Sequence, residues 1–112
     1  LNDENENVFV YSHLSHVYKQ GSSIYTTYIF RIGNSYEEGM NRWKKIKELG
    51  SLAILKAGGT INHQHGVGLD HKNYLVSEKG EIGIDTINSI FACLDPSEIM
   101  NSGKLTHKSD NI

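Results

Sequence analysis

The chain has 112 residues, 38% of them hydrophobic, which is enough for one core and one domain but not for two. Its 11 lysines and arginines against 13 aspartates and glutamates argue against a nucleic-acid-binding protein, which usually presents a strongly basic face. No apolar run approaches the roughly 18 residues of a membrane span, so we expect no transmembrane segment.

Both ends of the chain are expected to lack fixed structure. Residues 1–7 are acidic and polar, the opposite of a signal peptide, and they begin without an initiator methionine. We therefore expect disordered tails at 1–7 and 106–112 around a folded domain at 8–105. These features also suggest that the sequence is a piece of a longer protein.

Two segments near the N-terminus predict an antiparallel β-hairpin. Residues 8–18 and 23–32 are rich in β-branched and aromatic residues and contain no proline. The intervening residues 19–22 include Gly21 and have the composition of a turn. In a regular first strand, His13 and His16 would lie on opposite faces because they are three residues apart.

Two helices are expected after the hairpin. Ser35 and Glu38 have the spacing of a capping box, and Gly58 with Gly59 would end that first helix. A second helix is indicated by apolar residues spaced 3, 4 and 3 apart and ended by a proline: Ile84, Ile87, Phe91, Leu94 and then Asp95-Pro96.

Between the two helices, residues 60–65 read as a short extended segment that leads into a glycine loop. The full order is strand, strand, helix, short strand, loop, helix. It predicts an α+β domain, with helices laid on one face of a small antiparallel sheet.

The single cysteine, Cys93, cannot form an internal disulfide. It lies within the apolar pattern of the second helix, so we expect it to be buried in a reducing, cytoplasmic protein.

Five of the six histidines lie in two places, His13 and His16 in the first strand and His63, His65 and His71 around the glycine loop. In extended chain His63 and His65 would share a face, which suits metal chelation and equally suits a substrate cavity. A zinc site needs three or four ligands, and no cysteine or carboxylate is obviously placed to complete one. Metal ligation, catalysis or substrate contact, and ordinary polar contacts all remain open from the residues alone.

The glycines that follow this histidine pair also bear on ligand binding. Gly66 and Gly68 lack the third glycine of a dinucleotide-binding loop. Such a turn directly after His63-Gln64-His65 would let backbone amides approach a flat or anionic ligand.

Several separate motifs together resemble one family. They are Gly58-Gly59-Thr60-Ile61-Asn62-His63-Gln64-His65-Gly66-Val67-Gly68-Leu69-Asp70-His71, Glu78-Lys79-Gly80, Leu94-Asp95-Pro96, Asn101-Ser102-Gly103-Lys104, and, in the hairpin, His13 to Tyr18 with Gly21 to Tyr25. They resemble the C-terminal part of FAD-linked oxidases of the vanillyl-alcohol-oxidase superfamily, over about residues 8–105. The branch they most resemble is that of alkyldihydroxyacetonephosphate synthase (alkylglycerone-phosphate synthase).

This resemblance implies the latter part of a ferredoxin-like substrate (cap) domain, followed by a C-terminal tail that returns to the flavin-binding domain. The FAD-binding domain, which holds most of the cofactor, would precede Leu1 and would be the partner of this chain. The implied substrate is a small phosphate- or carboxylate-bearing alcohol, and a homodimer is compatible with this reading. The isolated chain is then expected to be inactive.

The resemblance also implies roles for individual residues. Tyr25 would be the acid/base residue, and His63 and His65 would act on the substrate beside the flavin. Contacts with FAD fall on Gln64, Gly66, Gly68, Asn101 and Lys104, and substrate contacts fall on His13, His16 and His71.

Departures from the family pattern keep two alternatives in view. Synthases of this branch carry three consecutive histidines, and a neutral amide at Gln64 cannot shuttle a proton as imidazole can, which favours a related FAD-linked oxidase. One alternative is a dehydrogenase of 2-hydroxy acids such as D-lactate or glycolate, whose branch often binds a divalent metal. Tyr25 and Gln64 stand where that branch has ligands, so we expect no metal. The other alternative is a non-enzymatic module that binds a metal through its histidines.

Overall fold

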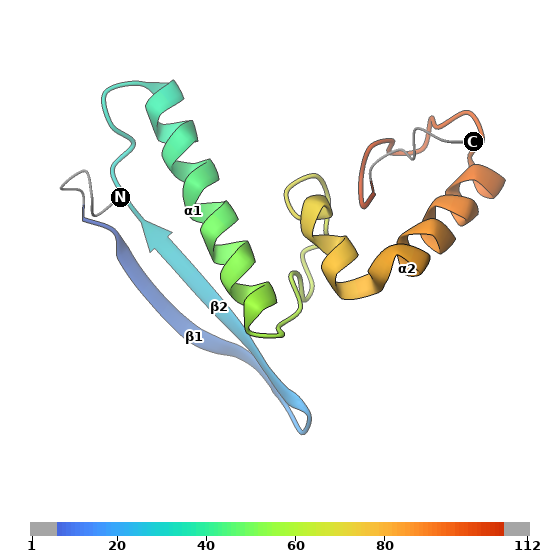
Figure 1. The fold of residues 1–112 in the computed structure, drawn as a ribbon. Helices are drawn as coiled ribbons and strands as arrows, with labels where there is room; N and C mark the ends of the chain where they lie inside the picture. Colours follow the sequence, from blue (N-terminus) through green and yellow to red (C-terminus); the bar gives the residue numbers. More distant parts are fainter. Residues whose placement is uncertain (1–6, 107–112) are drawn as a thin grey trace. The chain divides into compact units, whose positions relative to one another are not determined.

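A computed structural model of the chain describes residues 7–106. Two β-strands are followed by two α-helices: β1 (Phe9–Tyr18), β2 (Gly21–Ile29), α1 (Tyr36–Lys56) and α2 (Lys72–Leu94) (Figure 1). This confirms the predicted α+β class. Apart from Asn7 and Thr106, the expected tails fall outside the described residues.

The chain divides into two compact units, Leu1–Glu48 and Leu49–Ile112, and each is described by itself. The first unit holds the hairpin and the start of α1, and the second holds the end of α1, a long connection, α2 and the segment after it. Within residues 7–106, neither α1 nor α2 combines the length and hydropathy that a membrane-spanning helix requires.

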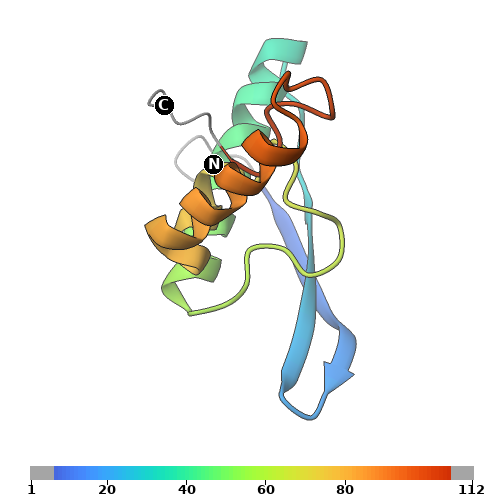
Figure 2. The ribbon, with the colours of Figure 1, turned by 90° about the vertical axis from the view of Figure 1, so that its right-hand side faces the viewer.

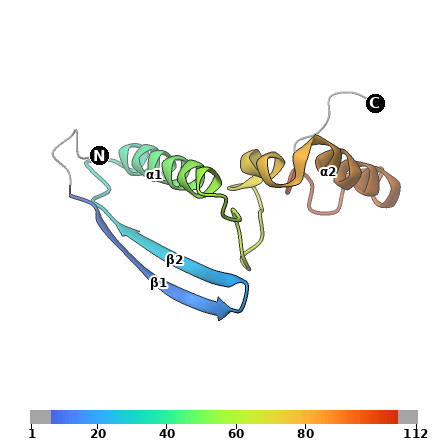
Figure 3. The ribbon, with the colours of Figure 1, turned by 60° about the horizontal axis from the view of Figure 1, so that its bottom comes forward.

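The two strands form an antiparallel hairpin, as predicted (Figure 3). Phe9 lies opposite Ile29, and Tyr18 lies opposite Gly21 across a tight turn. The second strand therefore begins at Gly21 rather than at Ser23, because pairing resumes directly after the turn residues.

A bulge in β1 changes which histidines share a face. The register shifts at Ser15, so that His13 lies opposite Tyr25 while His16 lies opposite Ser23. Residues 23 and 25 are two apart on β2 and share a face, so their cross-strand partners share it too. The prediction that His13 and His16 face opposite sides is wrong, because the extra residue restores their alignment.

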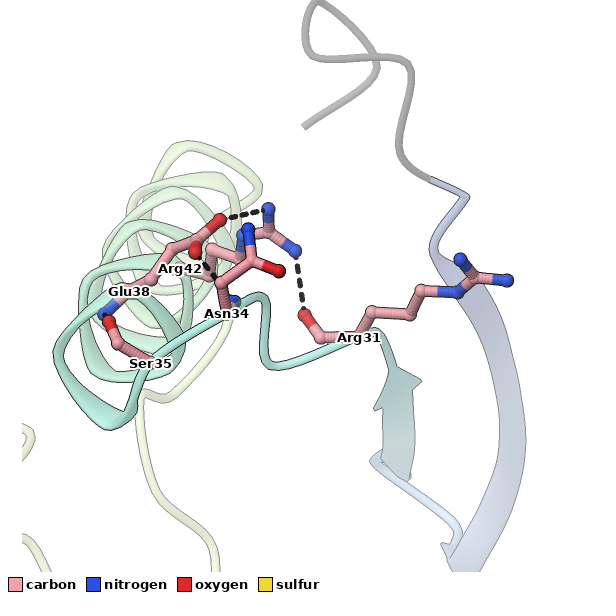
Figure 4. Close-up of polar contacts among 5 residues, drawn as sticks. All are labelled: Arg31, Asn34, Ser35, Glu38 and Arg42. Atoms are coloured by element: carbon pink, nitrogen blue, oxygen red, sulfur yellow. Dashed lines mark hydrogen bonds and ion pairs between the residues drawn. The ribbon is translucent and has the colours of Figure 1, made fainter.

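The beginning of α1 is fixed by the predicted capping pair and by one buried arginine (Figure 4). The Ser35 hydroxyl accepts the N–H of Glu38 at 3.1 Å, and the Glu38 carboxylate accepts the N–H of Asn34 at 2.7 Å. The same carboxylate pairs with Arg42 at 2.5 Å, and Arg42 also donates to the carbonyl of Arg31 at 2.9 Å. These bonds confirm the predicted helix start and tie it to the chain that leaves β2.

The end of α1 also agrees with the sequence. Gly58 has a φ of 73°, in the left-handed region that glycine adopts without a steric penalty. Its N–H bonds to the carbonyl of Leu55 at 3.0 Å, and the N–H of Gly59 bonds to the carbonyl of Ile54 at 3.0 Å. This pair of bonds is the Schellman arrangement that closes a helix.

The connection over residues 57–71 is a folded loop (Figure 2). The extended segment predicted at 60–65 is wrong, because these residues form a series of bends. Side chains from the loop itself and from α2 bond to its backbone, so no partner strand is used.

Helix α2 is longer than predicted. Its second half, through Leu94, confirms the expected helix, whereas the turns from Lys72 onwards were not expected. Gly80, with φ 68° and ψ 168°, interrupts the helical backbone and separates the two halves (Figure 3). Because the apolar spacing does not continue across Gly80, the spacing predicted only the second half of the helix.

Apolar burial is limited. Between residues 7 and 106, the buried hydrophobic side chains are Ile61 and Leu75, with 6% and 4% of their surface exposed. Cys93 is exposed, so the predicted burial of this thiol is wrong. The reason is that its neighbours Phe91 and Leu94 are exposed as well, so this part of α2 buries no apolar face within the described residues.

We expect Glu38→Ala to lower the free energy of unfolding by about 2 kcal/mol, because it removes the carboxylate partner of the buried Arg42 guanidinium and the acceptor of the Asn34 amide. Urea unfolding followed by circular dichroism measures this change. The matched control is Glu37→Ala in the same helical turn, where only the interaction with the helix dipole is lost, at about 0.5 kcal/mol. Equal effects of the two variants would contradict the assignment.

We expect Cys93 to react with a thiol reagent in the native chain at nearly the rate seen in denaturant, since its side chain is exposed. Absorbance of the released chromophore measures the rate, and Cys93→Ser gives the background. A native rate more than about a hundredfold slower would show that this face of α2 is covered.

Candidate functional site

The first group of candidate residues lies on one face of the hairpin. His13 and Tyr25 are directly opposite each other, and their rings stack with centroids 5.4 Å apart and an interplanar angle of 28°. Tyr25 has 45% of its surface exposed. An imidazole therefore lies against a phenol that ligands can still reach.

The bulge places further polar groups on the same face. Ser15 donates a hydrogen bond to the Ser23 hydroxyl at 3.1 Å, and its oxygen lies 3.2 Å from Nδ1 of His16. The rings of His16 and Tyr18 stack with centroids 6.1 Å apart. These imidazole, hydroxyl and phenol groups continue the row that begins at Tyr25.

The lysine and arginine side chains of the hairpin segment are not balanced by any carboxylate in the same segment. From residue 7 to residue 36 the sequence has no aspartate or glutamate, and its charged side chains are Lys19 and Arg31. The chain as a whole has a net charge of −2, so the hairpin contrasts with the rest. An acid-free strand pair with two histidines favours an anionic ligand over a cationic one.

The second group lies in the connection between α1 and α2, residues 57–71, which we call the histidine loop. The side chain of Asn62 accepts the N–H of His65 at 3.0 Å and donates to the carbonyl of Gly66 at 2.6 Å. Its amide nitrogen also lies 3.2 Å from Nδ1 of His71. One side chain thus connects three points of the loop, and His63, Gln64 and His65 are exposed around it.

The two glycines of this loop leave its backbone accessible. Gly66 and Gly68 have φ of 82° and 57°, and a Cβ placed on either would meet no atom within 4 Å. A planar group can therefore approach the peptide units here, which a side chain would obstruct.

The stem of the loop is attached to α2. The Glu78 carboxylate accepts a bond from the Thr60 hydroxyl at 2.9 Å and another from the N–H of Ile61. Sequence reasoning gave neither Asn62 nor Glu78 a separate role. Both residues lie within the motifs that resemble the family, so the sequence could have marked them as candidates. It could not show which backbone groups their side chains bind.

The segment after α2 returns to the histidine loop (Figure 1). The N–H of Leu105 donates to the carbonyl of Gly68 at 3.2 Å, and the Lys72 amine donates to the carbonyl of Gly103 at 3.2 Å. Thr106 is buried, and its hydroxyl bonds to Asn88 on α2 at 2.6 Å. The two stretches to which the resemblance gives FAD contacts, 64–68 and 101–104, therefore meet in one unit.

The predicted site residues thus form two sets. His13, His16 and Tyr25 share a hairpin face in the first unit. In the second unit, His71 joins the loop through Asn62, Lys104 is half-buried, and Asn101 is exposed with φ 53°. The catalytic roles given to Tyr25, His63 and His65 stay predictions.

One further cavity lies outside both sets. A pocket of about 500 Å³ in the first unit is lined by Arg31, Ile32, Gly33, Asn34 and Arg42. None of the predicted site residues lines it. Its buried arginine already pairs with Glu38, so the pocket belongs to the start of α1.

The chain belongs to the family of FAD-linked oxidases, as their C-terminal domain, whose model matches residues 1–105. It is similar to alkyldihydroxyacetonephosphate synthase of Trypanosoma brucei brucei, with 30% identity over 92% of this chain and 16% of that protein. The synthase of Dictyostelium discoideum is also 30% identical, over 97% of this chain and 18% of that protein. These findings confirm the resemblance drawn from the motifs.

A second group of relatives matches a shorter stretch. Mitochondrial D-lactate dehydrogenase [cytochrome] 1 of Saccharomyces cerevisiae is 39% identical over 51% of this chain and 10% of that protein. The chain thus spans less than a fifth of the length of these curated relatives. No solved structure matches it.

We expect the purified chain to carry no stoichiometric zinc. A structural zinc site needs three or four ligands, and residues 7–106 contain no group of three histidine, cysteine or carboxylate side chains placed to hold one. Elemental analysis after purification without a histidine tag measures the content. One equivalent of zinc that is lost in His63→Ala would contradict this and favour a metal-binding module.

Proposed function

We propose that this chain is the substrate-side part of the active site of a longer FAD-dependent oxidoreductase that resembles alkyldihydroxyacetonephosphate synthase. The observation that carries the proposal is the contact between the histidine loop and the segment after α2, through Leu105 and Gly68. Two motifs separated by a whole helix converge, as expected if both reach one cofactor.

The loop has the properties that a flavin ring would require of it. Gly66 and Gly68 expose backbone, and the side chains of His63, Gln64 and His65 are exposed beside them. When bound, FAD supplies the redox centre of such an enzyme. The residues of this chain would orient the substrate and move protons, with Asn101 and Lys104 adding contacts from the returning segment.

Tyr25 is the proposed acid/base residue. Its phenol is accessible and stacks on the His13 imidazole, so a second titratable group lies beside it. A general acid needs direct or water-mediated access to the reacting atom, which an exposed strand residue provides.

We propose a small alcohol that bears a phosphate or carboxylate as the substrate. The absence of acidic residues from 7 to 36 supports an anion at the hairpin face, where His16 would contact it. His71 would add a substrate contact from the loop.

The proposed partner is an N-terminal FAD-binding domain. The hairpin exposes large apolar side chains on both faces, including Phe9, Leu14 and Ile24. Extended apolar exposure of this kind marks a surface that another part of a protein covers.

The proposed compartment is the cytoplasm. A single cysteine without an internal partner fits a reducing compartment of this kind.

A dehydrogenase of 2-hydroxy acids is the second candidate, favoured by the 39% identity to yeast D-lactate dehydrogenase over half of the chain. Anaerobic mixing of the full-length flavoprotein with D-lactate or glycolate separates the two. Bleaching of the flavin band at about 450 nm by these acids would support the dehydrogenase.

The test of the main proposal uses the full-length protein that carries this sequence. Tyr25→Phe and His65→Ala should each lower turnover at least about tenfold while FAD stays bound, since each removes a group that contacts the reacting substrate. Tyr28→Phe is the matched control, because Tyr28 lies on the opposite face of the same strand. Full activity of Tyr25→Phe, or a protein without flavin, would contradict the proposal.

A further inference from the structure

The orientation of the Asn62 amide is fixed by two backbone groups of opposite kind. Its oxygen accepts from the N–H of His65, and its nitrogen donates to the carbonyl of Gly66. A flipped amide would direct NH₂ at an N–H and oxygen at a carbonyl, so both bonds would be lost. Only one orientation satisfies both neighbours.

This orientation determines the state of a second histidine. The nitrogen of Asn62 carries two hydrogens: one serves the carbonyl of Gly66, and the other is available to Nδ1 of His71, 3.2 Å away. Because an amide nitrogen can only donate, this contact is a hydrogen bond when Nδ1 accepts, which places the proton of the neutral ring on Nε2. The Asn62 side chain therefore selects one tautomer of His71.

We propose that Asn62 is the positioning residue of the histidine loop: it fixes the backbone that presents His63 to His65 and holds His71 as an Nε2–H donor. This role rests on the proposed function, in which the loop and His71 contact the ligands. The coupling is direct, because the same amide group bonds to the backbone of His65 and to the ring of His71.

Two charged residues lie next to His71 and are the same in every variant of the experiment described below. Asp70 and Lys72 flank it in the sequence, and the Lys72 amine is bonded to the carbonyl of Gly103. Neither is changed in the variants below, so differences among the position-62 variants arise from position 62 alone.

The experiment is nitrogen-15 NMR of the 112-residue chain, which reports the tautomer of each imidazole directly. In the unmodified chain we expect the Nε2–H tautomer for His71. Asn62→Asp replaces the NH₂ donor by a carboxylate oxygen, so the titration midpoint of His71 should rise by about 1 pH unit and the neutral ring should shift toward the Nδ1–H tautomer.

Two further variants separate positioning from general destabilisation. Asn62→Ala removes the acceptor of the His65 N–H, so exchange of that amide should accelerate at least about tenfold. Asn62→Asp loses the bond to the Gly66 carbonyl but keeps an acceptor for the His65 N–H, so exchange should stay slower than in Asn62→Ala. Asn73→Asp is the charge control, since it adds the same charge two residues from His71 at an exposed position. It should shift the His71 midpoint much less.

Either of two results would overturn the proposal. One is an Nδ1–H tautomer of His71 in the unmodified chain, which needs no variant to observe. The other is an unchanged His71 midpoint in Asn62→Asp. Neither readout involves turnover or flavin, so failure here leaves the assignment of Tyr25 and His65 to be judged by the activity test alone.

Discussion

Peptide groups must find hydrogen-bond partners, and the connection between α1 and α2 has no repeating ladder to supply them. Side chains, and the backbone of the segment after α2, supply these partners instead. Glu78 accepts the N–H of Ile61, Asn62 satisfies both a donor and an acceptor, and the segment after α2 contributes its N–H to Gly68. Because Ile61 and Leu75 are the only buried hydrophobic side chains between residues 7 and 106, these polar contacts determine the shape of the loop.

The parts of the fold that follow from the sequence are those whose cause is local. Ser35 and Glu38 are three residues apart and bond as a capping pair, and the stop at Gly58 needs only a residue that tolerates a positive φ. The hairpin follows from two segments of high β-propensity and a short turn. In each case the responsible groups lie within a few residues of one another.

The parts of the fold that could not be predicted depend on contacts between residues far apart in the sequence or on an interruption of the apolar spacing. The bends at 60–65 replace an extended segment because Glu78, on another element, binds their backbone. The first half of α2 was not predicted because Gly80 interrupts the apolar spacing. The exposure of Cys93 was not predicted because no helix or strand among residues 7–106 covers the last turns of α2. For the site, residue types and motifs indicated the histidines, whereas the part played by Asn62 depends on geometry.

The bulge at Ser15 has a consequence for how sequence spacing is compared among related proteins. With the extra residue, two histidines three apart present their rings on the same face as Tyr25. A regular strand would achieve the same placement with two histidines only two apart. The spacings His-x-x-His with a bulge and His-x-His without one are thus geometrically equivalent, so a one-residue gap in an alignment at this point would preserve the arrangement of side chains.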